Sequence, residues 1–286
     1  MKISIITPVY KGNKYLDKLL NNLKRIGNNL PNKVSLEWIL INDYPQEKII
    51  PLENNCKKIN IIKVSNKQNS GIHTTRVNGL KYATGEYIIF LDQDDKLAED
   101  SINNFLQNIN GKDFIIGNGY YEISANKKQL IFKSKLQMKA SLNIKTYFYV
   151  GNVIISPGMV MIKRTAIPIS WTDHSLKNNG SDDWLLWTLM LAEGKKGKVL
   201  FMPTYVHVKT GTNASDNSEG MIRSSKEALN VFKSDKPSFK KYSDVYEKRL
   251  HLMEEISVDK KNKIKIFLNH PFFLQNLLIY KFKGLL

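Results

Sequence analysis

Residues 86–95, EYIIFLDQDD, join a run of apolar side chains to three carboxylates, Asp92, Asp94 and Asp95. The apolar part is rich in Ile, Tyr and Phe, which is typical of a buried β-strand. Two like charges at the exit of such a strand are costly unless a cation lies between them. The stretch therefore predicts a buried strand that ends at a charged site.

The chain around this strand alternates between strand and helix patterns. Apolar, β-branched runs predict strands, and a stripe of Leu and Ile at helical spacing predicts a helix that Asn13 caps at its start and Gly27 at its end. The predicted strands cover 3–10, 36–43, 59–64 and 86–92, and the predicted helices cover 16–26, 72–83 and 102–109. This order predicts an α/β fold with a mostly parallel sheet covered by helices on both faces.

Ligands of such sheets bind beyond the carboxyl ends of the strands. That rule points to Thr7–Tyr10, Asn42–Asp43 and Asp92–Asp95. Asp92 and Asp94 would face the same side if the strand continued through them, because side chains of a strand alternate. A hard dication such as Mg²⁺ or Mn²⁺ would offset their repulsion and leave positions open for a diphosphate. For Asp95 we favour the alternative, a cap on the following helix.

Length, cysteine content and hydropathy set the expected compartment. The chain of 286 residues has one cysteine, Cys56, which excludes an internal disulfide framework and fits a reducing compartment. The apolar start before Pro8 is too short for a signal peptide and reads better as a first strand. No stretch reaches the ~18 to 20 apolar residues of a spanning helix. We therefore expect a cytoplasmic protein.

The net charge of +17 permits two interpretations. The excess of lysine could reflect codon bias, with no partner implied. The charge is uneven, however, because residues 260–286 hold six Lys and no acidic residue. A basic, apolar-rich tail indicates binding to an anionic membrane surface, which we expect to be the inner face of the plasma membrane. The alternative is a helical appendage that packs on its own domain or on a second subunit of a homo-oligomer.

Several segments together resemble a known family. The segments ISIITPVYKGNKYL (3–16), EWILIND (37–43) and GIHTTRVNGLKYATGEYIIFLDQDD (71–95) look like the nucleotide-binding half of the family 2 glycosyltransferases with the GT-A fold. The resemblance continues at SPGMVMIKRTAIPISW (156–171) and NNGSDDWLLWTLM (178–190) and covers roughly residues 3–213. It is strongest for members that build bacterial capsular or extracellular polysaccharides.

The resemblance implies roles for the first half of the chain. Thr7, Pro8 and Tyr10 match the strand exit that cradles the nucleotide base, and Asp43 matches the acid that reads uracil, which favours UDP. Arg76 matches the cation for a diphosphate or a sugar hydroxyl. The chain departs from the family pattern at Asn42, often Asp, and at Val77, often Asn.

The resemblance also implies the metal site and the base. Asp94 would bind Mn²⁺ or Mg²⁺ directly, Asp92 would reach the ribose or assist through water, and His207 would join the metal or the diphosphate unless its role is structural. Asp183 matches the catalytic base that takes the proton from the acceptor hydroxyl. Asp182 stands where the family usually has Glu and would support the acceptor or cap a helix.

We therefore expect an inverting, metal-dependent glycosyltransferase that moves a sugar from a UDP-sugar, or another NDP-sugar, to a glycan acceptor. We expect this acceptor to be lipid-linked and the reaction to belong to bacterial cell-surface polysaccharide synthesis. The expected domains are a GT-A domain over 1–220, with a nucleotide-sugar half at 1–100 and an acceptor half at 101–220, and a basic helical extension over 221–286. Residues 209–220 would form a loop that closes over the donor.

Two other classes of function stay open. A metal-dependent nucleotidyltransferase should carry a Gly-rich basic loop after its first strand, and TPVYKGNKYL (7–16) has only Gly12. A nucleic-acid-binding protein should cluster arginines and aromatic residues on one face. The chain has only five arginines, so we expect no nucleic-acid partner.

Overall fold

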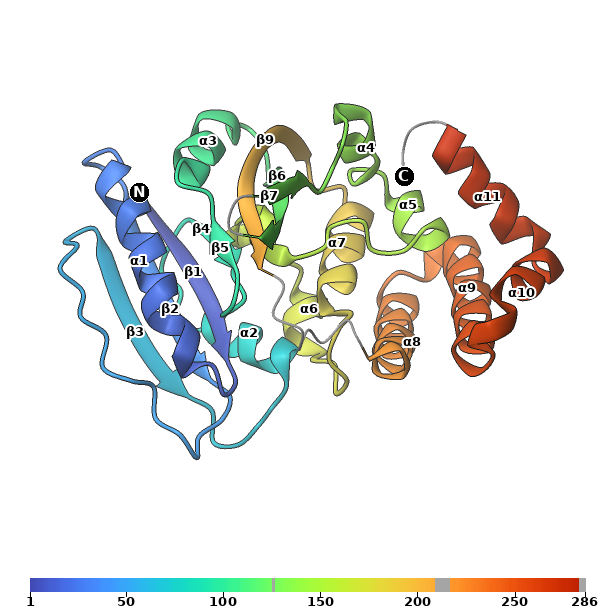
Figure 1. The fold of residues 1–286 in the computed structure, drawn as a ribbon, viewed down its shortest axis with the longest axis horizontal. Coiled ribbons are helices and arrows are strands. Elements are labelled where there is room, and N and C mark those ends of the chain that lie inside the picture. Colours follow the sequence, from blue (N-terminus) through green and yellow to red (C-terminus); the bar gives the residue numbers. More distant parts are fainter. Residues whose placement is uncertain (125–126, 209–216, 283–286) are drawn as a thin grey trace. The chain divides into compact units, whose positions relative to one another are not determined.

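The computed structural model describes residues 1–124, 127–208 and 217–282, which form two compact units (Figure 1). Unit 1 comprises residues 1–133, 155–167 and 195–211, and unit 2 comprises residues 134–154, 168–194 and 212–286. Each unit is therefore assembled from three separate stretches of chain. Most of the loop expected over 209–220 falls on residues 209–216, which lie outside the described residues.

Unit 1 contains a mixed sheet of nine strands in the order β3-β2-β1-β4-β8-β6-β9-β5, with β7 paired to β6. Strands β1 to β4 pair only in parallel with one another, whereas the pairings of β8 and β7, and that of β5 with β9, are antiparallel. The strands are β1 Lys2–Val9, β2 Ser35–Asn42, β3 Ile59–Ser65, β4 Tyr87–Phe90, β5 Lys96–Leu97, β6 Phe114–Ser124, β7 Lys127–Leu130, β8 Val160–Lys163 and β9 Gly197–Val208.

The described helices of unit 1 are α1 Asn13–Asn29, α2 Ile72–Leu80 and α3 Ser101–Asn108, with short 3₁₀ turns at Pro157–Met159 and Arg164–Ala166. The helices of unit 2 are α4 Lys135–Ala140, α5 Ile144–Tyr149, α6 Ile169–Asp173, α7 Asp182–Ala192, α8 Ser218–Asp235, α9 Lys240–Val258, α10 Lys263–Asn269 and α11 Pro271–Phe282, with 3₁₀ turns at Pro237–Phe239 and Lys260–Asn262. The expected α/β architecture and the helical character of the C-terminal region are thus confirmed.

The parallel register of unit 1 brings three strand exits to one edge of the sheet. Val9 pairs with Asn42 across β1 and β2, and Ile6 pairs with Phe90 across β1 and β4. The next amide on β2, Asp43 N, donates to the Val9 carbonyl at 2.7 Å. The carboxyl ends of β1, β2 and β4 therefore lie side by side, as the sequence predicts.

The apolar stripe of α1 is confirmed, but its predicted caps are wrong. Helix α1 begins at Asn13 and ends at Asn29, so Gly27 lies inside it. A Cβ at Gly27 would come within 2.9 Å of Cys56 Sγ, which means that the glycine is needed for close packing rather than for ending the helix. The Asn13 amide instead binds Glu47 Oε1 and the Lys48 carbonyl.

Strand β4 ends at Phe90, so Asp92 to Asp95 form a turn and the strand-like alternation assumed for Asp92 and Asp94 does not hold. The amide of Asp95 donates to the carbonyl of Asp92 at 3.2 Å. The next element is the short strand β5, and helix α3 starts only at Ser101. The prediction that Asp95 caps the following helix is therefore wrong.

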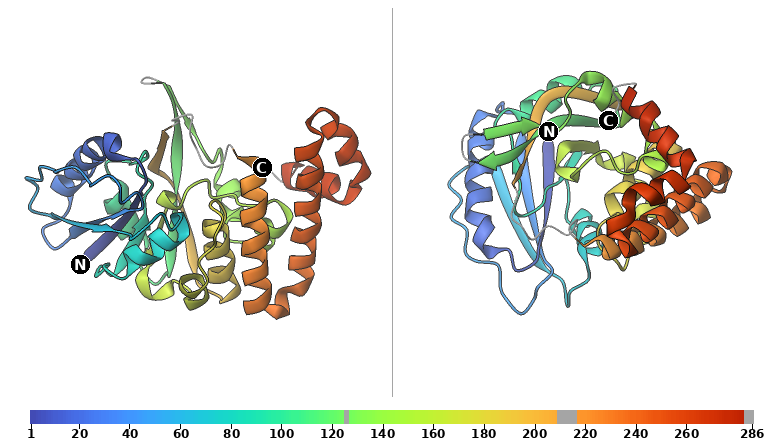
Figure 2. Two further views of the ribbon diagram at one scale, coloured as in Figure 1. Left: turned by 90° about the horizontal axis from the view of Figure 1, so that it is seen from below. Right: turned by 45° about the vertical axis from the view of Figure 1, so that its right-hand side comes forward.

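Unit 2 has an aromatic core that joins α5, α7, α8 and α9. Trp184 of α7 stacks on Tyr246 of α9 with ring centroids 4.4 Å apart, and Phe148 and Phe232 pack edge-on around them. Helices α8 and α9 run alongside each other in this core (Figure 2). In the described parts of the chain, no helix is both long and apolar enough to cross a bilayer.

Candidate active site

Asp43 organises the loop between β3 and α2. Its Oδ1 accepts hydrogen bonds from Asn66 Nδ2 at 2.8 Å and Ser70 N at 2.7 Å, and its Oδ2 accepts one from Gly71 N at 3.0 Å. Only 4% of Asp43 is exposed. Gly71, with φ of 82°, lets the chain turn into α2 at this point. The carboxylate is thus fixed in place and keeps lone pairs for a further donor.

Tyr10 presents an accessible ring at the exit of β1. Its side chain is 44% exposed and meets Tyr44 edge-on at 5.5 Å, and Lys11 Nζ lies 5.0 Å from the Tyr44 centroid. The other two residues predicted at this exit differ, because Thr7 and Pro8 are buried. The Thr7 hydroxyl already accepts a hydrogen bond from Trp38 Nε1 at 3.0 Å.

Gln93, which the sequence reasoning missed, ties the acidic turn to the β1 exit. Its amide accepts from Tyr10 N at 3.0 Å and donates to Tyr10 O at 3.1 Å. A Cβ at Gly12 would come within 1.8 Å of Gln93 Oε1, so glycine makes room for this amide. The spacing of Asp92 and Asp94 does not predict this role of Gln93, because the pattern places no requirement on the residue between the two carboxylates.

Arg76 lies directly against Asp92. Its Nη2 is 2.6 Å from Asp92 Oδ1, and the Arg76 side chain is only 4% exposed. The repulsion within the acidic turn is therefore partly offset by a protein cation. Burial raises the pKa of Asp92 to about 6, and the nearby carboxylates of Asp95 and Asp94 add to the rise while Arg76 opposes it. A ligand that needs the ionised carboxylate must displace a proton below about pH 6.

Asp95 joins the acidic turn to the end of β9. Its carboxylate accepts hydrogen bonds from the Tyr205 hydroxyl and from Val208 N, the latter at 3.0 Å. His207 Nδ1 lies 3.2 Å from Asp95 Oδ1, and this hydrogen bond raises the pKa of His207. With Nδ1 directed at the carboxylate, Nε2 is the ring nitrogen that a cation would have to use.

The donor set of this turn suits a sparsely coordinated hard cation. Asp92 and Asp94 are both partly exposed, and His207 is oriented by a carboxylate in the way that metal-bound histidines usually are. Among the described residues, no three His, Cys, Asp or Glu side chains are grouped as a preformed metal cage. The residues therefore fit a cation that shares its coordination with substrate phosphates rather than one enclosed by protein.

Unit 2 carries the other two predicted carboxylates, in the first turn of α7. Asp183 is partly exposed, its Oδ1 accepts from Trp184 N at 2.7 Å, and its Oδ2 accepts from Asn152 Nδ2 at 2.7 Å. Asp182 is only 2% exposed, and its carbonyl accepts from Trp171 Nε1 at 2.7 Å. Asp183 is thus the more accessible of the pair.

The segment before α7 is held by α8. Glu227 accepts hydrogen bonds from the amides of Lys177 and Asn178, and Ser225 pairs with Ser181 at 2.8 Å. Ser181 precedes α7, but its hydroxyl caps no helix amide. Neither these α8 residues nor Asn152 belongs to a recognisable motif, so they could not be predicted from the sequence. Trp171 and Trp184 are buried core residues, so neither ring is available to stack on a sugar.

A protein-family model described as "Glycosyl transferase family 2" matches residues 4–168. An uncharacterized glycosyltransferase of Rickettsia felis is 25% identical over 80% of this chain and 37% of its own length. The minor teichoic acid biosynthesis protein GgaB of Bacillus subtilis is 38% identical over 36% of this chain and 11% of its own length. The chain therefore spans little more than a third of these relatives at most.

Solved structures agree on the fold. The crystal structure of S. aureus TarS 1-349 in complex with UDP-GlcNAc superposes with a TM-score of 0.57 at 18% identity, over 82% of this chain and 67% of that one. The mannosyltransferase PcManGT from Pyrobaculum calidifontis, in complex with GDP-Man and Mn²⁺, gives 0.54 at 14% identity, over 98% and 74%. At such low sequence identity, these similarities show a shared fold and nothing about activity.

Proposed function

Because this chain belongs to glycosyl transferase family 2 and has the GT-A fold, we propose that it transfers a hexosyl or N-acetylhexosaminyl unit from a UDP-sugar to a hydroxyl of a glycan acceptor. The acceptor oxygen forms a bond to the anomeric carbon as the bond from that carbon to UDP breaks. The hydroxyl proton goes to Asp183. Attack from the face opposite the leaving group inverts the anomeric centre.

One observation carries the donor half of this proposal: the exits of β1, β2 and β4 bring an accessible tyrosine ring, a fixed carboxylate and an acidic turn to one edge. Tyr10 would stack on the base and Asp43 would accept its N–H. Arg76 would contact the diphosphate. Thr7 and Pro8 are both buried, so they would contribute to the base site only through the course of the backbone at the exit of β1.

The acidic turn would hold Mn²⁺ or Mg²⁺. Asp94 is the direct ligand in this proposal, with Asp92 and His207 completing the protein side. When bound, the dication neutralises negative charge on the departing diphosphate. A cation at His207 would compete with a proton for the imidazole, and Asp95 raises the pKa of that group. Asp95 itself orients the imidazole.

Asp183 is the proposed general base, and Asn152 and the amide of Trp184 fix its orientation. Asp182 is buried, so we assign it the support of the helix start rather than contact with the acceptor. The proposed division into a domain over 1–220 and an extension over 221–286 stays a prediction, as does homo-oligomerisation.

A thermal-shift measurement tests the proposed donor. We expect Mn²⁺ plus UDP, at about 100 times the dissociation constant, to raise Tm by about 5 °C or more. Mn²⁺ with CTP or with DNA should give a much smaller shift. An equal response to CTP would favour a nucleotidyltransferase, and stabilisation by DNA alone would contradict the proposal. Hydrolysis of a panel of UDP-sugars, followed by mass spectrometry, would then identify the sugar.

The acceptor is proposed to be a lipid-linked glycan of a bacterial surface polymer, which fits the similarity to a minor teichoic acid biosynthesis protein. The C-terminal helices support a location at the inner face of the membrane. Ile264 and Leu268 of α10 are 80% and 62% exposed, and Phe272 of α11 is 45% exposed. Exposed lysines at 261, 263 and 265 lie among them, so apolar and cationic side chains share one short segment.

Charge introduced into this segment should weaken membrane association. We expect the double substitution Ile264→Glu and Leu268→Glu to reduce pelleting with vesicles rich in phosphatidylglycerol by about tenfold. Two exposed apolar side chains that would enter the bilayer surface are lost, and two charges that the anionic lipid repels are gained. Ile169→Glu, at a site 75% exposed in α6, is the matched control. Equal pelleting of the double variant and the parent would refute the membrane contact.

A further inference from the structure

Among the residues that the structure describes, Arg249 of α9 is a cation without an anionic partner. Its guanidinium forms no ion pair with any described carboxylate, and its Nε is buried without a hydrogen-bond partner among the described residues. Its one hydrogen bond runs from Nη1 to the carbonyl of Tyr149 at 3.5 Å, the limit of useful geometry. Burial lowers the pKa of Arg249, so the protein holds this charge at a cost.

The charge lies close to Asp183 along two paths. The first is the backbone: Arg249 Nη2 would be 3.3 Å from a Cβ on Gly151, and the next residue, Asn152, donates to Asp183 Oδ2. Gly151, with φ of 109°, places no side chain against the guanidinium, and Arg249 is partly exposed. The Gly151 backbone and the Asn152 side chain therefore connect the region of the guanidinium to the Asp183 carboxylate.

The second path is Tyr246, which precedes Arg249 by one turn. Its ring stacks on Trp184, the residue after Asp183, and its hydroxyl experiences the fields of both Arg249 and Asp183. Helix α9 therefore places Arg249 beside the start of α7 independently of the Gly151 loop. A fixed planar cation without a protein anion is suited to a bidentate phosphate.

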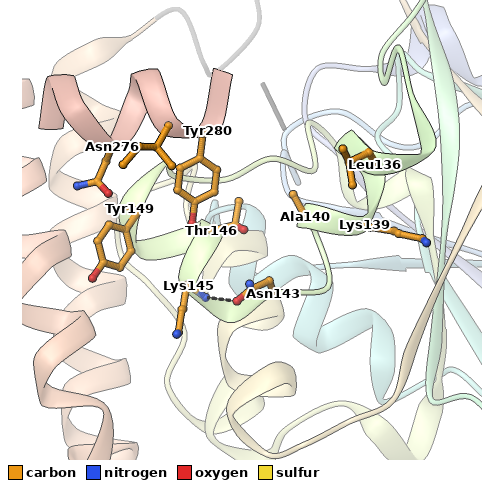
Figure 3. Close-up of a pocket in the computed structure, with 10 residues that line it drawn as sticks. Leu136, Lys139, Ala140, Asn143, Lys145, Thr146, Tyr149, Asn276 and Tyr280 are labelled. Carbon is orange, nitrogen blue, oxygen red and sulfur yellow. Dashed lines mark hydrogen bonds between the residues drawn. The ribbon is translucent and has the colours of Figure 1, made fainter. Parts of the chain in front are cut away.

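The same end of α5 opens onto a pocket. The ring of Tyr149, whose carbonyl Arg249 binds, lines a pocket of about 490 Å³ between α4, α5 and α11 (Figure 3). Lys139 and Lys145 line its walls, and none of its ten lining residues is acidic. Leu136, Ile279 and Tyr280 add apolar and aromatic surface to it. A ligand that carries both phosphate and carbon-rich parts matches this composition.

We propose that Arg249 binds a phosphate group of the acceptor beside Asp183, with the α4–α5–α11 pocket receiving the next part of the same acceptor. This inference rests on the proposed function, because it assigns the acceptor side of that reaction. The acceptor is then a phosphate-bearing one, and the phosphate belongs either to a polyol phosphate chain or to the pyrophosphate of a lipid-linked glycan. Arg249 is a specificity-determining residue in this scheme.

Titration calorimetry with two phosphate-bearing probes and one neutral probe tests the assignment. The probes are an oligomer of ribitol phosphate, a farnesyl-pyrophosphoryl disaccharide and an uncharged dextran oligomer. We expect Arg249→Gln to weaken binding of at least one phosphate-bearing probe by about 10-fold or more, the loss expected for a charge-assisted hydrogen bond. The affected probe identifies the source of the phosphate, and dextran affinity should not change.

Arg223→Gln is the matched control, because Arg223 is exposed and pairs only with Glu219 at 3.6 Å in the same unit. If Arg249→Gln does not fold, Arg249→Lys keeps the charge without the planar fork, and Lys139→Gln with Lys145→Gln removes two exposed pocket cations. Both variants should lower affinity, and the variant that lacks the two lysines should also show a flatter salt dependence. Unchanged affinity for both phosphate probes in the folded variants would overturn the inference, while a surviving Mn²⁺–UDP thermal shift would leave the donor proposal intact.

Discussion

Asp94→Ala is expected to abolish the Mn²⁺-dependent binding of UDP. Asp94 is the direct ligand in the proposed site, and the protein supplies few others, because Asp92 is already paired with Arg76 and Asp95 holds the end of β9. A metal site with so few protein ligands has no second carboxylate that could replace Asp94. We expect the affinity for UDP in the presence of Mn²⁺ to fall by about 100-fold or more, measured by calorimetry with and without the metal.

The matched control for Asp94→Ala is Asp100→Ala. Asp100 is exposed, follows the acidic turn by a few residues, and its side chain caps no amide of α3. Both variants should melt within a few degrees of the parent, because Asp94 is partly exposed and lies in a turn. UDP affinity that responds to Mn²⁺ as strongly in Asp94→Ala as in the parent would remove Asp94 from the metal site.

The sequence predicts the first half of unit 1 because its signals are local. Strands β1, β2 and β4 are continuous apolar runs, and α1 presents a one-sided stripe from Leu16 to Ile26 that is almost fully buried. Parallel pairing follows from the intervening helices, and the shared edge follows from parallel pairing. The positions of Tyr10, Asp43 and Asp92 at that edge therefore needed no long-range information.

The role of Asp95 was missed because it depends on residues far along the chain. Strand β5 has only two residues, and it exists because Lys96 and Leu97 pair with Val206 and Tyr205 of β9. Two residues are too few to show the alternation of a strand, so the local sequence favoured a helix that begins at Asp95. The same pairing brings Tyr205 and His207 to the Asp95 carboxylate. A strand that a distant partner creates cannot be read from its own residues.

The environment of Asp183 was equally hidden from the sequence. A resemblance places Asp183 at a helix start, but the groups that fix it come from elsewhere: Asn152 from the α5–β8 connection and Trp184 from its own helix. Helix α8, expected to belong to a C-terminal extension, binds the segment before α7 through Glu227 and Ser225. These contacts involve ordinary polar residues without spacing, and only the folded chain brings them together.

Asp183→Asn is expected to eliminate sugar transfer while leaving UDP binding unchanged. A general base contributes about 10²- to 10⁴-fold to a reaction of this kind, and an amide cannot accept the acceptor proton. The amide also replaces Oδ2, the atom that accepts from Asn152 Nδ2, so one hydrogen bond worth about 1 kcal/mol is lost. We therefore expect kcat to fall by about 10³-fold, with a small decrease in Tm.

Steady-state transfer assays and calorimetry separate these effects. Asp173→Asn is the matched control, because Asp173 is exposed in α6 of the same unit and its carboxylate accepts a hydrogen bond from the neighbouring Thr172 hydroxyl. Asn152→Ala should give an intermediate loss of kcat, since it removes a group that orients the base but keeps the base itself. Turnover by Asp183→Asn within tenfold of the parent would exclude Asp183 as the general base. Asp182 would not take over this role, because at 2% exposure it has no access to an acceptor hydroxyl.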